Sequence, residues 1–118
     1  MTRDDVLEYC SGRVGAVEDY PFGEGVVVFK VGGRIFALVM LEGNPGFVNL
    51  KCDPELALGL RARHSAVRPG YHMDKRHWNS VDLDATIHDD DLREMIDHSH
   101  DLVVGKLPRA ERDRLRGT

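Results

Sequence analysis

Two apolar runs joined by Gly32-Gly33 restrict the possible folds of this chain more than any other feature. The stretch VVVFKVGGRIFALVML is rich in β-branched and aromatic residues, which favour extended strands. A Gly-Gly pair between two such runs favours a two-residue hairpin turn, because both turn positions need a positive φ angle. The sequence therefore predicts an antiparallel hairpin, and with it a fold that contains a sheet.

A turn centred on the glycine pair also predicts which residues lie opposite one another. The expected cross-strand pairs are Val31 with Arg34, Phe29 with Phe36, and Val27 with Leu38. These side chains share one face of the hairpin. The opposite face is largely apolar too, and consists of Val26, Val28, Ile35, Ala37 and Val39 beside Lys30. A hairpin that is apolar on both faces is either covered on both sides or presents a binding surface.

Outside the hairpin, local signals predict an α+β domain with the element order α-β-β-β-α-β-β-α. The predicted elements are a helix over 3–13, an extended stretch over 16–20, the hairpin, a strand over 47–51, a helix to about Arg63 that is capped by Asp53, a strand, tight turn and strand around Asp74-Lys75, and an amphipathic helix capped by Asp89 or Asp90. Pro108 interrupts the last helix, which leaves 109–118 as a charged tail or a short helix. Hairpin-connected strands followed by helices indicate a twisted antiparallel sheet with helices packed against it.

Length and composition indicate a single domain over residues 1–118. The chain is 42% hydrophobic and 31% charged, and no apolar run approaches the roughly 20 residues of a membrane helix. Its acidic, polar amino terminus is unlike a secretory signal, so we expect a cytoplasmic protein without membrane contact. Cys10 and Cys52 lack metal-binding spacing, which predicts two free buried thiols in a reducing compartment.

Charge is distributed unevenly along the chain, whose formal net charge is −4. The segment 51–77 contains six Lys or Arg against three acidic residues, whereas 82–101 contains eight acidic residues against one Arg. The segment 106–116 is basic again, with five Arg or Lys against two acidic residues. A negative total argues mildly against nucleic-acid binding, whereas separate basic patches still permit phosphate contacts.

The stretch PGYHMDKRHWNSVDLD, residues 69–84, concentrates histidine, basic and aromatic side chains. A metal site, a nucleic-acid contact, a catalytic cluster and a purely structural charged turn are its alternative interpretations. His72 and His77 could reach one metal ion, with Asp74 or His88 completing the site, but no zinc-site spacing surrounds them. Nucleophile motifs and glycine-rich phosphate loops are also missing, so we predict no catalysis and no cofactor.

Basic residues at the two predicted hairpin tips favour a contact with nucleic acid. Lys75, Arg76 and His77 lie at one tip, where they would donate to phosphate oxygens as a wing does. Lys30 and Arg34 flank the glycine turn of the other tip and would form a second prong. Basic residues at turns also serve simply to solvate a hairpin, so a structural role stays open.

Five blocks follow one another along the chain: YPFGEG, VFKVGGRIFAL, NLKCDPELALGLR, PGYHMDKRHWNSVDLD and MIDHSHDLV. In these blocks the sequence resembles the MmcQ/YjbR family of small bacterial proteins, from about Val6 to Arg112. The run GYHM-x-KRHWN is the most specific of the matches.

The resemblance implies a CyaY/frataxin-like α+β fold and a DNA-binding role through a double-wing motif. The positions that match in the two tips are Lys30, Arg34, His72, Lys75, Arg76, His77 and Trp78. The chain departs from the family at Asp74, where Asn is commoner, and at His100, where Tyr is commoner. The Asp74 carboxylate either weakens a phosphate contact at its tip, or pairs with Lys75 or Arg76 and holds the turn rigid.

Three hypotheses of function remain after the sequence alone. In the first, the two basic tips contact DNA phosphates, and Trp78 anchors its tip to the core. In the second, the chain is a protein-interaction or chaperone-like module that uses the apolar sheet face around Val26, Val28, Ile35 and Val39. In the third, a metal ion or small ligand binds near His72 and His77. A monomer and a homodimer are both compatible with these hypotheses.

Overall fold

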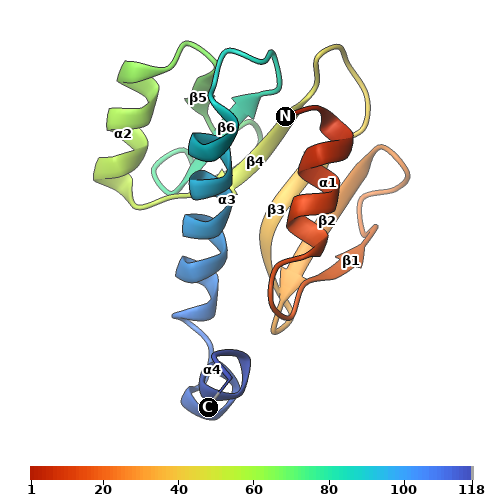
Figure 1. Ribbon diagram of the computed structural model, residues 1–118, viewed down its shortest axis with the longest axis vertical. Coiled ribbons are helices and arrows are strands. Elements are labelled where there is room, and N and C mark those ends of the chain that lie inside the picture. Colours follow the sequence, from red (N-terminus) through yellow and green to blue (C-terminus); the bar gives the residue numbers. More distant parts are fainter. Residues whose placement is uncertain (118) are drawn as a thin grey trace.

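A six-stranded antiparallel sheet in the order β1-β2-β3-β4-β6-β5 is the frame of the computed structural model, which describes residues 1–117 (Figure 1). Its strands are β1 (Val17–Asp19), β2 (Val26–Val31), β3 (Arg34–Met40), β4 (Phe47–Lys51), β5 (Val67–Pro69) and β6 (Trp78–Asp82). The helices are α1 (Arg3–Ser11), α2 (Pro54–Arg63), α3 (Asp89–Val104) and α4 (Arg109–Leu115). The predicted α+β class, with helices packed against an antiparallel sheet, is confirmed.

The structure adds two elements to the predicted order. Strand β1 forms inside the stretch expected to be extended and pairs with β2, with Val17 opposite Lys30. Helix α4 occupies residues 109–115, so the helical alternative is correct for that part of the 109–118 segment. Thr118 lies outside the described residues. An element this short has too few residues for a periodic apolar pattern. For this reason the predicted order α-β-β-β-α-β-β-α contains neither β1 nor α4.

The predicted hairpin register is right at its turn and wrong beyond it. Val31 pairs with Arg34 as expected, but a β-bulge then shifts the pairing, so that Phe29 lies opposite Ala37. Phe36 is the extra residue of the bulge, and the predicted pairs of Phe29 with Phe36 and of Val27 with Leu38 are both wrong. One inserted residue moves every later side chain of its strand to the opposite face, because side chains alternate with a period of two.

This shift changes the composition of the two sheet faces. Ala37 and Val39 join the core under the helices, whereas Leu38 lies on the other face opposite Val28. Val28 and Val39 are each 0% exposed. The apolar surface of the protein-interaction hypothesis is therefore smaller than the sequence suggested, since only Val26 and Ile35 of its four residues are partly accessible.

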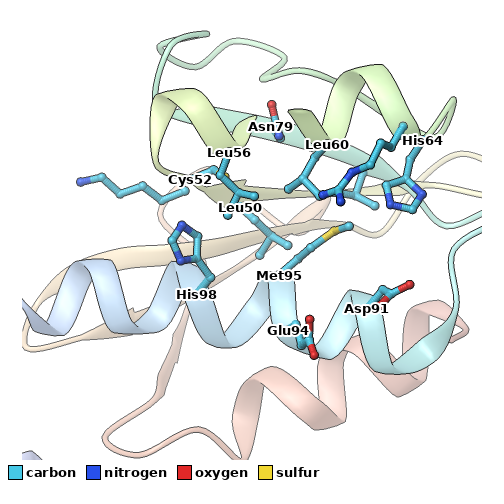
Figure 2. Close-up of a pocket in the computed structure, with 13 residues that line it drawn as sticks. Leu50, Cys52, Leu56, Leu60, His64, Asn79, Asp91, Glu94, Met95 and His98 are labelled. Carbon is cyan, nitrogen blue, oxygen red and sulfur yellow. The ribbon is translucent and has the colours of Figure 1, made fainter. Parts of the chain in front are cut away.

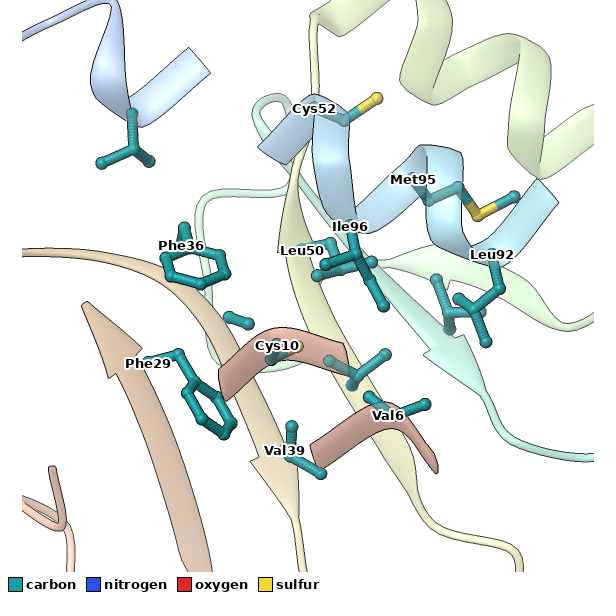
Figure 3. Packing of buried hydrophobic residues seen from close by; sticks show 14 of the residues in the cluster. Val6, Cys10, Phe29, Phe36, Val39, Leu50, Cys52, Leu92, Met95 and Ile96 are labelled. Carbon is teal, nitrogen blue, oxygen red and sulfur yellow. The ribbon is translucent and has the colours of Figure 1, made fainter. Parts of the chain in front are cut away.

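The main core lies between the sheet and helices α1 and α3, which cross the same face of the sheet (Figures 1 and 3). Its central side chains are Val6 and Cys10 from α1, Leu92, Met95 and Ile96 from α3, and Phe29, Phe36, Val39 and Leu50 from the strands. The predicted amphipathic pattern of α3 is confirmed, because its apolar positions recur every three or four residues and face this core. The two predicted free buried thiols, Cys10 and Cys52, are confirmed as well.

Helix boundaries follow the local signals with two corrections. Asp53 caps α2 directly before Pro54, as predicted. Helix α1 ends at Ser11, about two residues earlier than expected, because Gly12 closes it with backbone bonds. The cap of α3 is His88 rather than Asp89 or Asp90, since the His88 ring nitrogen accepts from the Asp90 backbone N–H at 3.2 Å. The acidic residues instead occupy the first turn, where the helix dipole stabilises them.

The segment between β5 and β6 is longer than the predicted tight turn at Asp74-Lys75. It spans residues 70–77 and makes two successive turns, in which Met73 N–H donates to the Gly70 carbonyl and His77 N–H donates to the Asp74 carbonyl. His72 adopts a positive φ of 58°, which one simple hairpin turn would not require. We call residues 70–77 the signature loop.

One face of the sheet carries no helix among residues 1–117, since α1, α2 and α3 all pack on the other side and Leu115 of α4 packs against the same core. We call it the open face. Along β4 and β6 it presents Phe47, Asn49, Lys51, Trp78 and Ser80, which are the positions that alternate with core residues. None of the helices formed by residues 1–117 has the length and apolarity of a membrane span.

Candidate functional site

Both predicted hairpin tips emerge from the same end of the sheet. Arg34 begins β3, Lys51 ends the neighbouring strand β4, and Lys51 in turn pairs with Trp78 at the start of β6. The Gly32-Gly33 turn and the signature loop therefore lie at the same ends of neighbouring strands. We call this end of the strands the tip end of the sheet.

Two of the predicted phosphate-binding cations have partners within the protein. The Lys75 ammonium donates to the Gly70 carbonyl at 3.1 Å, which closes the signature loop on itself. Lys30 lies 2.8 Å from the Asp19 carboxylate of the adjacent strand. A cation that already has an acceptor must give it up to bind a phosphate, so Lys30 and Lys75 are weaker candidates than their sequence positions indicated.

Asp74 organises the signature loop through Arg76, which the sequence offered as a partner, and through His77, which it did not. Its carboxylate lies 2.7 Å from His77 Nδ1 and also accepts the Arg76 backbone N–H at 3.0 Å. These two hydrogen bonds, that of His77 first, hold the pKa of Asp74 below its usual value. Of the two alternatives for Asp74, pairing with Arg76 is found, but through the Arg76 backbone N–H; the Arg76 side chain is exposed and has no bonding partner among residues 1–117.

Three cations from separate segments gather at the tip end. Burial, and then the positive charges of Lys106 and Arg34, hold the pKa of Lys51 below its usual value, while the Asp74 carboxylate acts in the opposite direction. In the described part of the chain, the side chains of Arg34, Lys51 and Lys106 have no hydrogen-bond acceptor or ion-pair partner. We call these three residues the basic cluster. Three like charges held near one another form an attractive position for an anion, and the Asp74 carboxylate offsets them only in part.

Arg61 of α2 attaches the signature loop to the rest of the fold. Its guanidinium donates to the backbone carbonyl of Lys75, to that of Trp78 at 3.3 Å, and to Asn79 Oδ1 at 2.7 Å. Asn79 is only 2% exposed, so this last bond is shielded from water. Arg61 therefore joins α2, β6 and the loop in one polar network.

Trp78 stands where the signature loop enters β6, and it is half-buried on the open face. Its carbonyl accepts the Gly70 N–H at 2.9 Å. A Cβ atom at Gly70 would lie 2.8 Å from the Trp78 Cβ, which explains why glycine occupies this position. The Pro69-Gly70 pair thus lets the loop pass directly against the strand that follows it.

Aromatic side chains cover the β4–β6 part of the open face. The Phe47 and Tyr71 rings meet edge to face with centroids 5.8 Å apart, and the His72 ring lies 4.0 Å from that of Tyr71. The Arg68 guanidinium stands 4.6 Å from the Phe47 ring centroid, and it also pairs with the Asp82 carboxylate at 2.9 Å. Tyr71 is 52% exposed. We call Phe47, Tyr71, His72 and Arg68 the aromatic stack.

Two buried polar side chains of the sheet, Asn49 and Ser80, form hydrogen bonds with the backbone of Tyr71. Asn49 Nδ2 donates to the Tyr71 carbonyl at 3.1 Å, and the Tyr71 N–H donates to Ser80 Oγ at 2.9 Å. Ser80 Oγ donates in turn to Asn49 Oδ1, so the two side chains and the loop backbone form a closed ring of hydrogen bonds. Asn49 and Ser80 are 1% and 0% exposed.

Histidines contact different partners instead of converging on a metal position. No group of three potential metal ligands occurs among residues 1–117. His77 bonds Asp74, His72 stacks on Tyr71, and His98 accepts the Asp53 backbone N–H at 3.2 Å. The metal hypothesis for His72 and His77 therefore gains no support from the arrangement of these side chains.

A cleft of about 430 Å³ lies between α2, α3 and β4 (Figure 2). Its apolar lining includes Leu50, Cys52, Leu56, Leu60 and Met95. The rim is formed by the charged side chains of Lys51, Arg63, Asp91 and Glu94 and by the imidazoles of His64 and His98. Both signs of charge are present, so the rim does not select one class of ionic ligand. Lys51 is common to the cleft and the basic cluster.

The cleft contains one of the two thiols, and neither thiol has the environment of a reactive cysteine. Burial raises the pKa of Cys10 to about 12, and burial followed by the charge of Asp53 raises the pKa of Cys52 to about 11. Since only the thiolate attacks disulfides, we expect both to react with a disulfide reagent near pH 8 far more slowly than in the unfolded chain. Timed labelling with mass spectrometry should find Cys52 modified before Cys10, and rapid labelling of Cys10 in the folded protein would contradict the structure.

Several residues of the site were missed in the sequence, and each had a different signal. Tyr71 stands inside the most specific family block, but its aromatic ring was overlooked beside the charged residues. Lys51 and Lys106 are isolated basic residues in sequence, so only strand pairing and the end of α3 bring them together. Arg61 sits in the last turn of α2 together with Arg63, and nothing local distinguishes the two arginines.

Comparisons with known proteins agree on one family. A family model described as YjbR matches residues 13–102. The chain is 36% identical over 115 residues to the uncharacterized protein YjbR of Escherichia coli, covering 98% of both chains. It is 43% identical over 98 residues to the uncharacterized protein YbdF of Escherichia coli, covering 82% of this chain and 80% of that protein.

A solved structure shows the same fold. The crystal structure of a Deinococcus radiodurans protein superposes with a TM-score of 0.90 at 37% sequence identity, covering 98% of this chain and 88% of that one. A protein from Pseudomonas syringae superposes with a TM-score of 0.76 at 26% identity.

Proposed function

This chain belongs to the YjbR family, and from that premise and its own geometry we propose that it contacts DNA phosphates at the tip end of its sheet, without catalysing a reaction. The observation that carries the proposal is the basic cluster of Arg34, Lys51 and Lys106, which holds three cations together without acceptors in the described chain. Arg76 extends from the signature loop at the same end of the sheet. Phosphate oxygens are the acceptors that such a group of donors suits.

The proposed interface is centred on different residues from those expected from the sequence. The sequence indicated Lys75 and Arg76 as the main contacts, with Lys30 and Arg34 as the second prong. Lys30 and Lys75 are engaged with Asp19 and Gly70, so Arg34 and Arg76 remain from that set and Lys51 and Lys106 join them. The two-pronged arrangement is retained, since Arg34 and Arg76 belong to different tips.

The net charge of −4 does not exclude this contact, because three of the acidic side chains are concentrated in the first turn of helix α3, at the end away from Lys106. That turn carries Asp89, Asp90 and Asp91, and Lys106 follows the other end of the helix. A helix of 16 residues is about 24 Å long at roughly 1.5 Å per residue. Over that distance the acidic turn is screened from the basic cluster, since the Debye length is about 8 Å at physiological salt.

Fluorescence anisotropy with a short labelled duplex at several salt concentrations tests the proposal. A contact to two or three phosphates should give a slope of roughly −2 to −3 in log K against log salt, at about −0.9 per phosphate, and weak micromolar binding at best. The double variant Arg34→Glu with Lys51→Glu should reduce affinity at least ten-fold. The double variant Lys75→Glu with Arg76→Glu should have a smaller effect, because Lys75 is already bonded within its loop.

The matched control is Arg63→Glu with Arg93→Glu, which changes the net charge equally at positions on α2 and α3. It should reduce affinity only slightly, and circular dichroism should show that all variants remain folded. Equal losses in the test and control variants would mean that only total charge matters, which contradicts a local site. The absence of duplex binding at low salt would refute the proposal altogether.

A further inference from the structure

The aromatic stack has no role in a contact with duplex phosphates, and it lies on the open face, which also presents Lys51 of the basic cluster. Phe47 and Lys51 are both open-face residues of β4, separated by four residues of extended strand, or roughly 13 Å at about 3.3 Å per residue. Tyr71 contacts Phe47, so its ring stands beside the same strand. One short extended ligand can therefore reach the exposed ring and Lys51 together, and Arg34 lies just beyond Lys51 at the tip end.

The Tyr71 ring is held in place, although half of it is exposed to solvent. Its backbone N–H and carbonyl are both bonded to the buried side chains of Ser80 and Asn49. The Phe47 ring contacts the Tyr71 ring with the two planes at 89°, and His72 packs against it with a positive φ of 58°, a conformation that costs about 1 kcal/mol or more for a non-glycine residue. The loop thus orders an exposed aromatic surface before any ligand arrives, which lowers the entropy cost of stacking on it.

The chemistry of the stack matches an unpaired nucleobase. Aromatic rings on an uncovered sheet face are a common platform for bases of single strands, whereas bases inside a duplex already stack on each other and offer no free face. The Arg68 charge is balanced by Asp82, so its guanidinium contributes a flat surface against Phe47 more than a phosphate contact. The cations that can receive phosphates are those of the neighbouring basic cluster.

We propose that the open face binds single-stranded nucleic acid, with a base stacked on Tyr71 and the adjoining phosphates directed toward Lys51 and Arg34. This inference rests on the proposed phosphate contact and specifies its ligand. It predicts a preference for single strands over duplex, and little sequence preference, because every base presents a flat π-face while the stack offers few groups to read base edges.

Anisotropy with a labelled oligo-thymidine strand and with the labelled duplex separates this inference from the proposed function. Tyr71→Ala should weaken single-strand binding by about five- to a hundred-fold, the range expected for one stacked base, and leave duplex binding unchanged. Tyr71→Phe should behave as the parent protein, because the ring is retained and the Tyr71 hydroxyl has no hydrogen-bond partner among residues 1–117. Tyr20→Ala is the matched control, since Tyr20 is 50% exposed but lies beside β1.

Each outcome has a distinct meaning. Unchanged single-strand binding in Tyr71→Ala, together with losses on both nucleic acids in Arg34→Glu with Lys51→Glu, would overturn the stacking inference and leave the phosphate contact standing. Equal losses in Tyr71→Ala and Tyr20→Ala would also overturn it. If the parent protein bound neither probe at low salt, both proposals would fail, and the open face would have to be tested against a protein partner.

Discussion

Phe36→Ala should lower the free energy of unfolding by about 3–5 kcal/mol, the usual cost of deleting a fully buried phenylalanine ring. Phe36 is 0% exposed and packs between Phe29, with ring centroids 6.3 Å apart, and the edge of His100 at 5.1 Å. The site cannot collapse easily, because the Ser99 hydroxyl holds the Phe36 carbonyl at 2.6 Å and fixes the bulge to α3. For a domain whose total stability is typically about 5–15 kcal/mol, the remaining margin would be small.

Urea unfolding followed by the fluorescence of Trp78, the one tryptophan of the chain, measures this loss. The control is Phe22→Ala, which removes the same ring from a position that is 63% exposed and should cost less than about 0.5 kcal/mol. Comparable destabilisation by the two substitutions would mean that Phe36 is not packed in the core. A changed urea dependence in Phe36→Ala would instead indicate a loss of compactness in addition to a loss of stability.

Arg61→Leu should cost about 2–3 kcal/mol, although Arg61 lies in the last, partly exposed turn of a surface helix. The substitution keeps an apolar stem but leaves the buried Asn79 Oδ1 without its donor, and an unsatisfied buried acceptor costs roughly 1–3 kcal/mol. The carbonyls of Lys75 and Trp78 also lose a partner, but Lys75 is exposed and its carbonyl can turn to water. We expect the signature loop to loosen first.

Two measurements separate the global effect from the local one. Urea unfolding gives the loss of stability, and amide hydrogen exchange should show faster exchange in residues 70–77 under conditions where the core is still protected. Arg63→Leu is the matched control, because Arg63 occupies the same last turn of α2 and has no bonding partner among residues 1–117. If both substitutions had the same small effect, Arg61 would not anchor the loop.

The helix starts and the main turn were predictable because their signals are local. Thr2 with Asp5 forms a reciprocal cap, and Asp53 directly before Pro54 begins α2, each through hydrogen bonds within three residues. The Gly32-Gly33 turn follows from the φ angles that only glycine adopts easily, and the structure has 59° and 78° at these positions. The amphipathic period of α3 likewise indicated which of its faces meets the core.

The bulge at Phe36 could not be predicted from the sequence of the hairpin alone. Nothing in FKVGGRIF distinguishes a regular hairpin from one with an extra residue, since either register places apolar side chains on both faces. The choice depends on α1 and α3, whose core accommodates Phe36, Ala37 and Val39 together. Both helices are distant in sequence, so a pattern limited to the hairpin could not contain this information.

The sequence by itself determined the α+β class, the caps, the main turn and the presence of a charged, aromatic-rich signature block, because each depends on residues close together in the chain. The tertiary structure decided which of those side chains are available. It bonded Lys30 and Lys75 within the protein, and it placed Asn49, 22 residues before Tyr71 and 31 before Ser80, where these three hold the exposed ring in position. Strand pairing and helix packing join such distant residues, and that is why the basic cluster and the aromatic stack emerge only in the folded chain.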